Sequence, residues 1–345
     1  AADAELLEGA TSAAVFEQSV RDAGGHVDFI FGDNRPFDSC HASTIAHVGD
    51  GILVCAWFGG TEESADDVAI WLSRLDGESW SAPERVAKIS ATAHWNPVLF
   101  APGDGNLHLF FKVGPEIPEW QTWWMTSSDG GVTWSEPVEL VPGDYGGRGP
   151  VRCKPIVLAD GAWLAGASTE RGIWKPFADR TDDRGKTWTR SADFRFDRKV
   201  IKVQGAIQPT LWESEAGRVH ALMRTNAGVV VRADSTDGGR TWSGIRRTGL
   251  PNNNSGVDAV AIDGALYLVF NPVRRNWGPR TPLSLAVSHD NGETWVVIAH
   301  LEDDSNEDVE YSYPAAVAAN DGIAVSYTWN RERIRVWRIP FAALR

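Results

Sequence analysis

Cysteine, methionine and long apolar runs are all scarce in this 345-residue chain. The three cysteines, Cys40, Cys55 and Cys153, have no CxxC spacing, so they indicate neither a disulfide framework nor a zinc site. No apolar run approaches the roughly eighteen residues that span a bilayer, and the N-terminal AADAELLEGA lacks a signal pattern. We therefore expect a soluble protein without a bound metal, and the sequence leaves its compartment open.

Positive charge is also in short supply. The chain has 33 Lys and Arg against 46 Asp and Glu, a formal net charge of −13. An acidic chain is a poor partner for nucleic acid, because phosphate binding needs a basic face. Helix-favouring stretches are absent after about the first twenty positions, whereas Trp (17) and Gly (34) are plentiful. This composition favours an all-β protein that binds neither nucleic acid nor a membrane.

The chain does contain an internal repeat. Four segments, starting at 127, 181, 235 and 288, share the pattern Ser/Thr-x-Asp-x-Gly-x-Thr-Trp, and a fifth at 73 has Leu75 in place of the Asp. Their last residues are spaced 53 or 54 positions apart: Trp80, Trp134, Trp188, Trp242 and Trp295. Each copy has turn chemistry, with an Asp to bind backbone amides, a Gly for positive φ and a Trp to pack beneath the turn. We interpret each copy as a lock between two strands.

This motif is the Asp-box, and with it the chain resembles the sialidase (neuraminidase) superfamily of β-propellers over about residues 35 to 345. A propeller blade takes roughly 40 to 50 residues, so the repeat predicts an all-β, six-bladed β-propeller that forms one domain over 1–345. The last blade is short, so the N-terminal strand 26–31 is expected to close the ring. The expected blades are 41–93, 94–150, 151–204, 205–255, 256–309 and 310–345.

A second periodic signal marks the start of each blade, where a polar residue precedes an apolar strand. These residues are His41, Asn96, Lys154, Gln208, Asp258 and Tyr313. Because the first strand of each blade lines the central channel, they predict a polar ring at one end of it. Sixteen positions later the second strand should return to the same end, which adds Trp57, Lys112, Glu170, Arg224 and Trp329, with Arg280 in the fifth blade. Basic groups in such a ring suit an anionic ligand.

The resemblance implies specific roles at this ring. Sialidases hold a substrate carboxylate with three arginines, use a Tyr activated by a Glu as nucleophile, and use an Asp as acid and base. By this resemblance Tyr313 is the nucleophile, Arg224 and Arg280 are two of the arginines, and Asp67 is the acid/base residue, with Asp66 equally placed.

Two positions depart from the family pattern. The first inner strand reads SCHASTI, with His41 but no arginine, and Gln208 stands where the activating Glu is expected. In a hydrolysis, Tyr313 would attack the anomeric carbon, assisted by Arg224 or Lys154. His41 can act as base or acid near neutral pH, and the layout is similar to that of propellers that act on rhamnose–glucuronate linkages. In an elimination, His41 would remove the C5 proton and Tyr313 would protonate the leaving oxygen.

The sequence thus predicts an axial pocket for an acidic oligosaccharide and no cofactor. An exo-acting sialidase-like glycoside hydrolase is the first hypothesis; a lyase or rhamnosidase-type enzyme at a uronate linkage and a lectin-like propeller are the alternatives. The expected catalytic residues are Tyr313, His41, Asp67, Arg224 and Arg280. The expected substrate-binding residues are Lys154, Gln208, Asn96, Asp258, Glu170, Lys112, Trp57 and Trp277.

Overall fold

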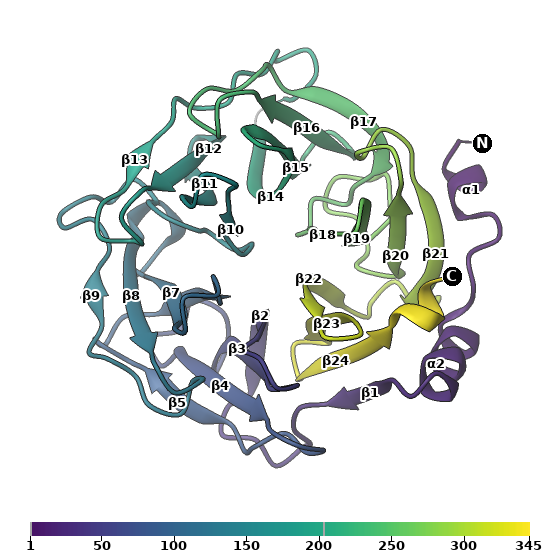
Figure 1. Ribbon diagram of the computed structural model, residues 1–345, viewed down its shortest axis with the longest axis horizontal. Coiled ribbons are helices and arrows are strands. Elements are labelled where there is room, and N and C mark those ends of the chain that lie inside the picture. Colours follow the sequence, from purple (N-terminus) through teal and green to yellow (C-terminus); the bar gives the residue numbers. More distant parts are fainter. Residues whose placement is uncertain (1, 203) are drawn as a thin grey trace.

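The computed structural model describes residues 2–202 and 204–345, with Ala2 by its backbone alone. Within these residues, 24 strands form six antiparallel sheets of four strands each, arranged as blades around a central channel (Figure 1). The predicted all-β, six-bladed propeller is therefore confirmed. In each of blades 1 to 5 the strands follow one another in chain order from the channel outwards.

Blades 1 to 3 cover the first half of the ring. Blade 1 comprises β2 (Ser39–His47), β3 (Leu53–Gly60), β4 (Ala69–Leu75) and β5 (Glu84–Ala87). Blade 2 comprises β6 (His94–Phe100), β7 (Leu107–Val113), β8 (Gln121–Ser127) and β9 (Val138–Glu139), with the short helix η1 (Ile117–Glu119) before β8. Blade 3 comprises β10 (Ile156–Val157), β11 (Trp163–Arg171), β12 (Ile173–Thr181) and β13 (Thr189–Arg190).

Blades 4 to 6 complete the ring. Blade 4 comprises β14 (Ala206–Glu215), β15 (Arg218–Thr225), β16 (Val229–Ser235) and β17 (Arg246–Pro251). Blade 5 comprises β18 (Asp258–Ile262), β19 (Ala265–Phe270), β20 (Leu283–Ser288) and β21 (Val296–Glu302). Blade 6 comprises β22 (Tyr311–Ala319), β23 (Gly322–Trp329), β24 (Arg333–Pro340) and, as its outer strand, β1 (His26–Phe29).

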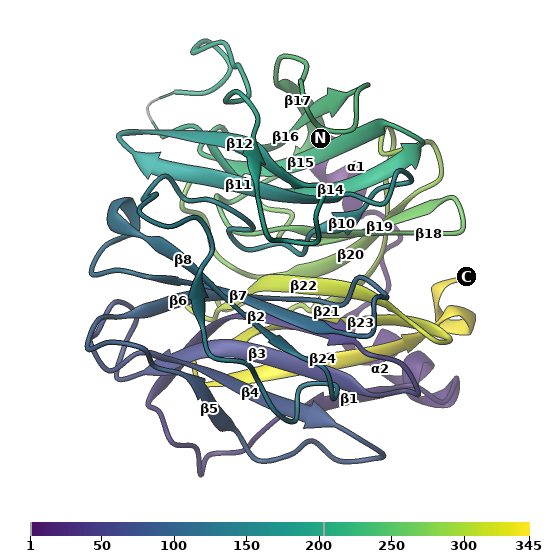
Figure 2. The same cartoon turned by 60° about the vertical axis from the view of Figure 1, so that its left-hand side comes forward.

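The two ends of the chain meet at blade 6. β1 pairs antiparallel with β24, so that the N-terminal strand lies beside the last strand of the chain. Helices α1 (Ala2–Leu7) and α2 (Ala13–Asp22) lie outside the ring near β21 and β24, and the short helix η2 (Phe341–Leu344) follows β24 (Figures 1 and 2). α2 buries Phe16, which stacks on Trp337 with ring centroids 5.7 Å apart. Among the described residues, no helix is both long and apolar enough to cross a membrane.

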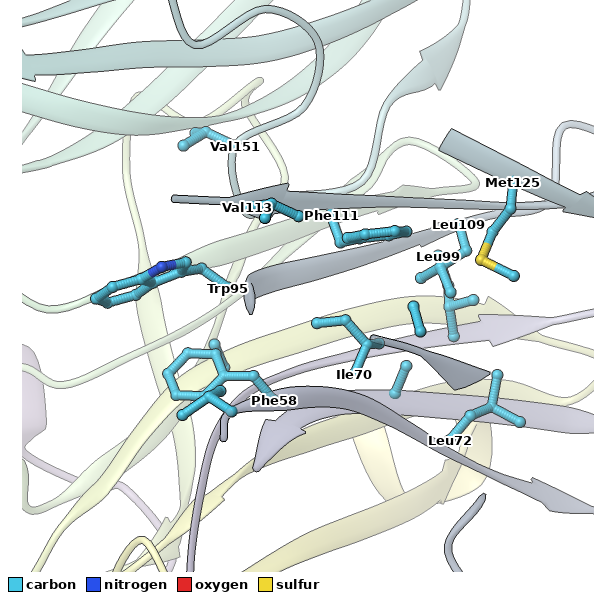
Figure 3. Packing of buried hydrophobic residues seen from close by; sticks show 14 of the residues in the cluster. Phe58, Ile70, Leu72, Trp95, Leu99, Leu109, Phe111, Val113, Met125 and Val151 are labelled. Carbon is cyan, nitrogen blue, oxygen red and sulfur yellow. The ribbon is translucent and has the colours of Figure 1, made fainter. Parts of the chain in front are cut away.

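Apolar clusters lie at the interfaces between neighbouring blades. Between blades 1 and 2, Phe58 and Ile70 face Trp95, Leu99 and Phe111, and all five are buried (Figure 3). Burial of such side chains is the main favourable term in folding. The sheets are therefore fixed face to face, and this packing sets where each innermost strand begins around the channel.

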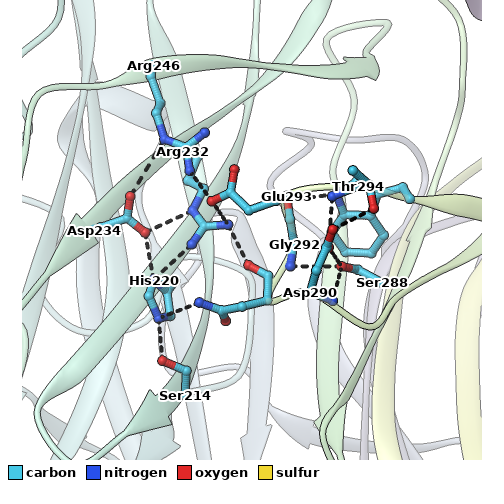
Figure 4. Close-up of polar contacts among 12 residues, drawn as sticks. Ser214, His220, Arg232, Asp234, Arg246, Ser288, Asp290, Gly292, Glu293 and Thr294 are labelled. Atoms are coloured by element: carbon cyan, nitrogen blue, oxygen red, sulfur yellow. Dashed lines mark hydrogen bonds and ion pairs between the residues drawn. The ribbon is translucent and has the colours of Figure 1, made fainter.

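The Asp-box turns join the third and fourth strands of blades 2 to 5. In blade 4 the Asp237 carboxylate accepts the Thr241 N–H at 2.8 Å and the Thr241 hydroxyl at 2.6 Å, while the Trp242 indole donates to the turn backbone at 2.9 Å. Asp290 of blade 5 makes the same bonds (Figure 4). In blade 1 Leu75 replaces the Asp, and an antiparallel backbone bridge between Leu75 and Trp80 takes the place of the Asp contacts. These contacts fit the structural role predicted for the motif.

A polar network connects blade 4 to blade 5 beside the last Asp-box (Figure 4). The Ser214 hydroxyl and the Asp234 carboxylate contact the two ring nitrogens of His220 at 2.7 and 2.6 Å. Arg232 donates to Asp234 at 2.8 Å and to the Asn291 carbonyl of blade 5 at 2.6 Å. Although Ser, His and Asp are the residue types of a catalytic triad, this Asp is shared with a guanidinium that bridges two blades. We therefore interpret the network as a cross-link between blades.

Candidate functional site

The site is built around β-bulges near the start of four innermost strands. In blades 1, 2, 4 and 6 the pairing of the first and second strands shifts register. The residues with positive φ in these bulges are Ala42 (58°), Asn96 (38°), Gln208 (59°) and Tyr313 (53°). This conformation costs a residue that has a side chain about 1–2 kcal/mol, and such strain is concentrated at functional sites. A bulge also re-aims the side chain that it carries.

Blade 1 does not follow the predicted phase of the polar ring. Ala42, rather than His41, occupies the position equivalent to Tyr313, and His41 lies one residue earlier, opposite Phe58. In each of these blades the residue just before the bulge pairs with one residue of the second strand. That partner is Arg224 in blade 4, Phe58 in blade 1 and Thr328 in blade 6. A shift of one residue moves a side chain to the other face of its strand.

This shift explains the placement of two predicted tryptophans. Trp57 is fully buried between blades 6 and 1, where it packs against Phe31 and Phe37. Trp329 packs against Phe29 of the outer strand β1. Trp57, which we expected to bind substrate, therefore belongs to the hydrophobic core.

Lys112 also makes its hydrogen bonds to other protein groups. Its buried ammonium donates to the Thr122 hydroxyl at 2.7 Å and to the Arg148 carbonyl at 2.8 Å. Burial lowers the pKa of Lys112 to about 7, and the Asp179 carboxylate opposes this effect. These contacts hold Lys112 in blade 2 and favour a structural role over the predicted contact with substrate.

Lys154 and Asp258, two members of the predicted ring, bind each other. The Lys154 ammonium lies 3.1 Å from the Asp258 carboxylate and donates to the Ala259 carbonyl at 2.8 Å. Asp258 is 1% exposed and also accepts the Thr210 hydroxyl at 2.7 Å and the Ala316 N–H at 2.8 Å. The carboxylate thus joins blades 3, 4, 5 and 6, which favours a structural role for the pair.

Tyr313 lies among guanidinium groups. Arg224 donates from Nη1 to the Tyr313 hydroxyl at 2.8 Å. The guanidinium carbons of Arg152, Arg224 and Arg280 lie 5.4, 5.7 and 5.4 Å from the centroid of the Tyr313 ring. The His41 ring centroid is 4.1 Å from the same ring. The structure therefore brings together four of the five predicted catalytic residues and adds Arg152.

Glu310 orients two of the nearby cations. Its carboxylate accepts Arg280 Nη1 at 2.5 Å, the Ser312 hydroxyl at 2.7 Å and Arg331 Nε at 3.0 Å. Arg331 also pairs with Glu63 from the loop between β3 and β4. Burial raises the pKa of Glu310, but Arg280 and Arg331 outweigh burial and hold that pKa below its usual range. The site therefore contains an ionised carboxylate that fixes the guanidinium groups.

His41 is held as a neutral imidazole. It is 1% exposed, and its Nδ1 makes a 2.8 Å hydrogen bond with the Thr328 hydroxyl. Burial and then the charges of the surrounding arginines lower the pKa of His41 well below its usual value. Its Nε2 has no hydrogen-bond partner among the residues described. A neutral imidazole with one free nitrogen is able to exchange a proton with a ligand.

Asp67, which is not among the residues gathered at Tyr313, and Glu170, which lies beside Arg224, differ in their readiness to hold a proton. Asp67 accepts the Thr61 hydroxyl at 2.6 Å and the Thr61 N–H at 3.0 Å, and these bonds lower the pKa of Asp67. Burial raises the pKa of Glu170 in β11, and Arg224 opposes that effect. Asp66, the alternative to Asp67, is exposed in the same loop. Glu170 is therefore better suited to donate a proton than Asp67.

Two tryptophans form an aromatic edge beside Arg224. The rings of Trp174 and Trp277 meet edge to face at 6.1 Å, and the Arg224 guanidinium lies 5.8 and 5.9 Å from their centroids. Trp277 is 54% exposed and has a φ of 52°, which is a strained conformation for a large residue. A hollow of about 370 Å³ opens next to it and is lined by Trp277, Arg280 and Glu310 among others.

Several site residues were not predicted, because they lie outside the periodic strand positions. Asn254, for example, accepts Arg224 Nε at 3.1 Å and Nη2 at 3.0 Å from within the buried segment NNNSG. That run of polar residues was the available signal, since a buried polar segment needs partners. The unpredicted residues are Glu63, Arg152, Asn254, Glu310 and Arg331.

Comparisons with known proteins agree with this architecture. The family model described as BNR repeat-like domain matches residues 51–325. A search of curated protein sequences found no match. Among solved structures, Hadza microbial sialidase Hz136 is 17% identical with a TM-score of 0.74, and the alignment covers 91% of this chain and 68% of that one.

Two further structures extend the comparison. A protein of unknown function from Dyadobacter fermentans is 18% identical with a TM-score of 0.70, over 91% of this chain and 98% of that one. Trypanosoma rangeli sialidase in complex with sialic acid is 17% identical with a TM-score of 0.70, over 95% of this chain and 60% of that one. At these identities the similarity concerns the fold alone.

Proposed function

Because the chain belongs to the BNR repeat-like domain family and its fold is similar to that of sialidases, we propose that it is a glycoside hydrolase that removes an acidic sugar from a glycan. The observation that carries this proposal is Tyr313, held in a strained conformation with Arg224 bonded to its hydroxyl and three guanidinium groups around its ring. The site contains two carboxylates, Glu310 and Glu63, which form ion pairs with arginines. The arginines number four, namely Arg152, Arg224, Arg280 and Arg331, so positive charge exceeds negative charge and favours an anionic ligand.

In the proposed reaction the Tyr313 hydroxyl oxygen attacks the anomeric carbon, and the hydrogen bond from Arg224 stabilises negative charge on that oxygen. The amide of Gln208 is unable to take the phenol proton, whereas neutral His41 has a free nitrogen for it. Glu170 donates its proton to the leaving glycosidic oxygen, and then accepts a proton from the water that releases the sugar from Tyr313. The exposed face of Trp277 supports the apolar face of the sugar chain.

The free Nε2 of His41 also favours a second candidate, elimination at a uronate. Here His41 removes the C5 proton while the arginines neutralise the uronate carboxylate, and Tyr313 protonates the leaving oxygen. The same residues thus serve two reactions that differ in their products. Hydrolysis adds water across the glycosidic bond, whereas elimination leaves a conjugated, unsaturated uronate that absorbs ultraviolet light.

Incubation with sialosides and with rhamnosyl-glucuronate oligosaccharides tests both candidates. We expect release of a free acidic sugar without new ultraviolet absorbance, and a loss of about a thousandfold or more in kcat for Tyr313→Phe. Tyr311→Phe, on the same strand but packed in the core between blades 5 and 6, is the matched control and should keep full activity. Release of no sugar from a broad panel of acidic glycans would refute catalysis and leave a lectin-like propeller.

A further inference from the structure

Arg152 is a buried cation with unused donors. It lies between β9 and β10, and the residue is 2% exposed. Its Nη2 donates to the Val257 carbonyl at 2.7 Å and lies 3.4 Å from Cys153 Sγ. Nε and Nη1 are buried and have no hydrogen-bond partner in residues 2–202 and 204–345. A buried guanidinium without an anion is costly, so this arrangement needs a compensating function.

The surrounding backbone holds Arg152 in place without neutralising it. The preceding residue, Val151, is fixed to blade 2 by a bond from Asn96 to its carbonyl at 3.1 Å. Gly256 leaves room for the guanidinium, because a Cβ there would lie 2.9 Å from Arg152 Nε and 3.1 Å from its Cζ. No ion pair of Arg152 with a carboxylate occurs in the part of the chain that the structure describes. The charge is therefore fixed and uncompensated, 5.4 Å from the Tyr313 ring.

The other arginines around Tyr313 are already engaged. Arg280 shares the Glu310 carboxylate with Arg331, and Arg224 binds Asn254 and the Tyr313 hydroxyl. A ligand carboxylate near these groups would compete with existing partners. At Arg152 it would meet free donors instead.

Two more buried groups lack partners within the described ranges, namely Gln208 Oε1 and His41 Nε2, and the His41 ring lies beside Tyr313. Gln208 is close to Arg152, because Cys153 contacts both the Gln208 carbonyl and Arg152. The Gln208 oxygen needs a hydrogen-bond donor, which a carboxylate or an inorganic anion lacks and a sugar hydroxyl has. Arg152 and Gln208 together match a molecule that carries a carboxylate and hydroxyls, and His41 Nε2 stays available for proton transfer.

We propose that Arg152 is the residue that binds the carboxylate of the acidic sugar, with Gln208 receiving a hydroxyl of the same sugar ring. This inference rests on the proposed function, since it places that acidic sugar in the same pocket. It names a binding residue in the segment that leads into blade 3, where two donors of a guanidinium are unpaired among the described residues, in place of the missing arginine on the first inner strand.

Direct binding of monosaccharides tests the proposal without any turnover. The probes are N-acetylneuraminate and glucuronate, with glucose as the uncharged comparison, and isothermal titration calorimetry measures the dissociation constants. We expect at least one sugar acid to bind the wild-type protein and Arg152→Met to weaken that binding by about 10- to 100-fold, as for loss of a hydrogen bond to a charged group. Arg171→Met, which removes an exposed arginine that, among the described residues, donates to the Pro118 and Tyr145 carbonyls, is the control with the same charge change and should bind normally.

Two gentler variants keep the test valid if Arg152→Met fails to fold. Gly256→Ala displaces the guanidinium without altering any charge, and Arg152→Lys retains the charge but not the guanidinium geometry; both should weaken sugar-acid binding while the folded protein persists. Unchanged binding in a folded Arg152 variant would overturn the inference, as would no sugar-acid binding to the wild type. If binding depends on Arg152 but no glycoside is cleaved, the inference stands and the proposed hydrolase activity falls.

Discussion

Replacing Asp258 by Ala tests whether the Lys154–Asp258 pair holds the ring together. The Asp258 carboxylate is buried, and its removal leaves the Thr210 hydroxyl without its acceptor and the Lys154 ammonium without its counter-charge, with the Ala259 carbonyl as its remaining acceptor. Breaking a buried ion pair by removing one partner costs about 3–5 kcal/mol, because the remaining charge is uncompensated. The Lys154 side chain is 18% exposed, so water reaches it and we expect the lower end of that range, about 3 kcal/mol.

Replacing Lys154 instead should lower the free energy of unfolding by less. In Lys154→Met the buried carboxylate also loses its counter-charge, but its bonds from the Thr210 hydroxyl and the Ala316 N–H continue to stabilise its negative charge, so the loss is closer to that of one charged hydrogen bond. That contribution is about 1.5 kcal/mol. The double variant should be less destabilised than the sum of the two single changes, because it leaves no unpaired charge.

Calorimetric unfolding measures these differences. An unfolding entropy of about 2.1 cal/mol/K per residue gives about 0.7 kcal/mol/K for this chain. Asp258→Ala should therefore lower Tm by about 4 °C and Lys154→Met by about 2 °C, while sugar-acid binding by Lys154→Met stays at the wild-type level. A larger loss of Tm in Lys154→Met than in Asp258→Ala would refute this reasoning, and so would loss of binding at an unchanged Tm.

Two further predictions concern His41 and Asp237. Because burial lowers the His41 pKa, the unfolded chain binds a proton below pH 6.5 that the native state does not, so wild-type stability falls there. The Tm difference between wild type and His41→Gln should then narrow toward acid pH, and a gap that stays constant or widens contradicts the assignment. Asp237→Ala removes the two Thr241 bonds of an Asp-box and should cost about 1–2 kcal/mol in denaturant unfolding while glycan cleavage is unchanged; reduced cleavage by the folded variant contradicts a purely structural role.

The number of blades could be predicted because one local device is used repeatedly. Each complete Asp-box closes the same hairpin with the same Asp, Thr and Trp contacts, as Asp237 and Asp290 show. The spacing of those turns therefore measures the length of a blade directly. The incomplete copy at Leu75 keeps the spacing because backbone pairing replaces the missing carboxylate.

The site could be predicted only in part from the same periodicity. Arg224, Arg280 and Tyr313 meet because the starts of the first strands, the ends of the second strands and the loops that follow these recur at one end of the channel. A bulge adds one residue without changing the length of the repeat, so spacing could not show that Ala42 rather than His41 takes the equivalent place. The position of a loop residue depends on tertiary contacts that have no period, which is why Arg152 and Glu310 were missed.

Charge balance connects the two departures from the family pattern. A glutamate at position 208, beside the segment that carries Arg152, would offer that guanidinium a protein carboxylate and compete with a ligand for it. Gln208 has the same shape but no charge, so Arg152 remains uncompensated. Burial, and then the charges of the four nearby arginines, lower the pKa of His41, which keeps a further positive charge out of the site and leaves Nε2 without a partner among the described residues. Gln208 therefore leaves the positive charge of Arg152 available to the proposed anionic sugar, whereas neutral His41 limits the total positive charge of the site and supplies a nitrogen for proton transfer.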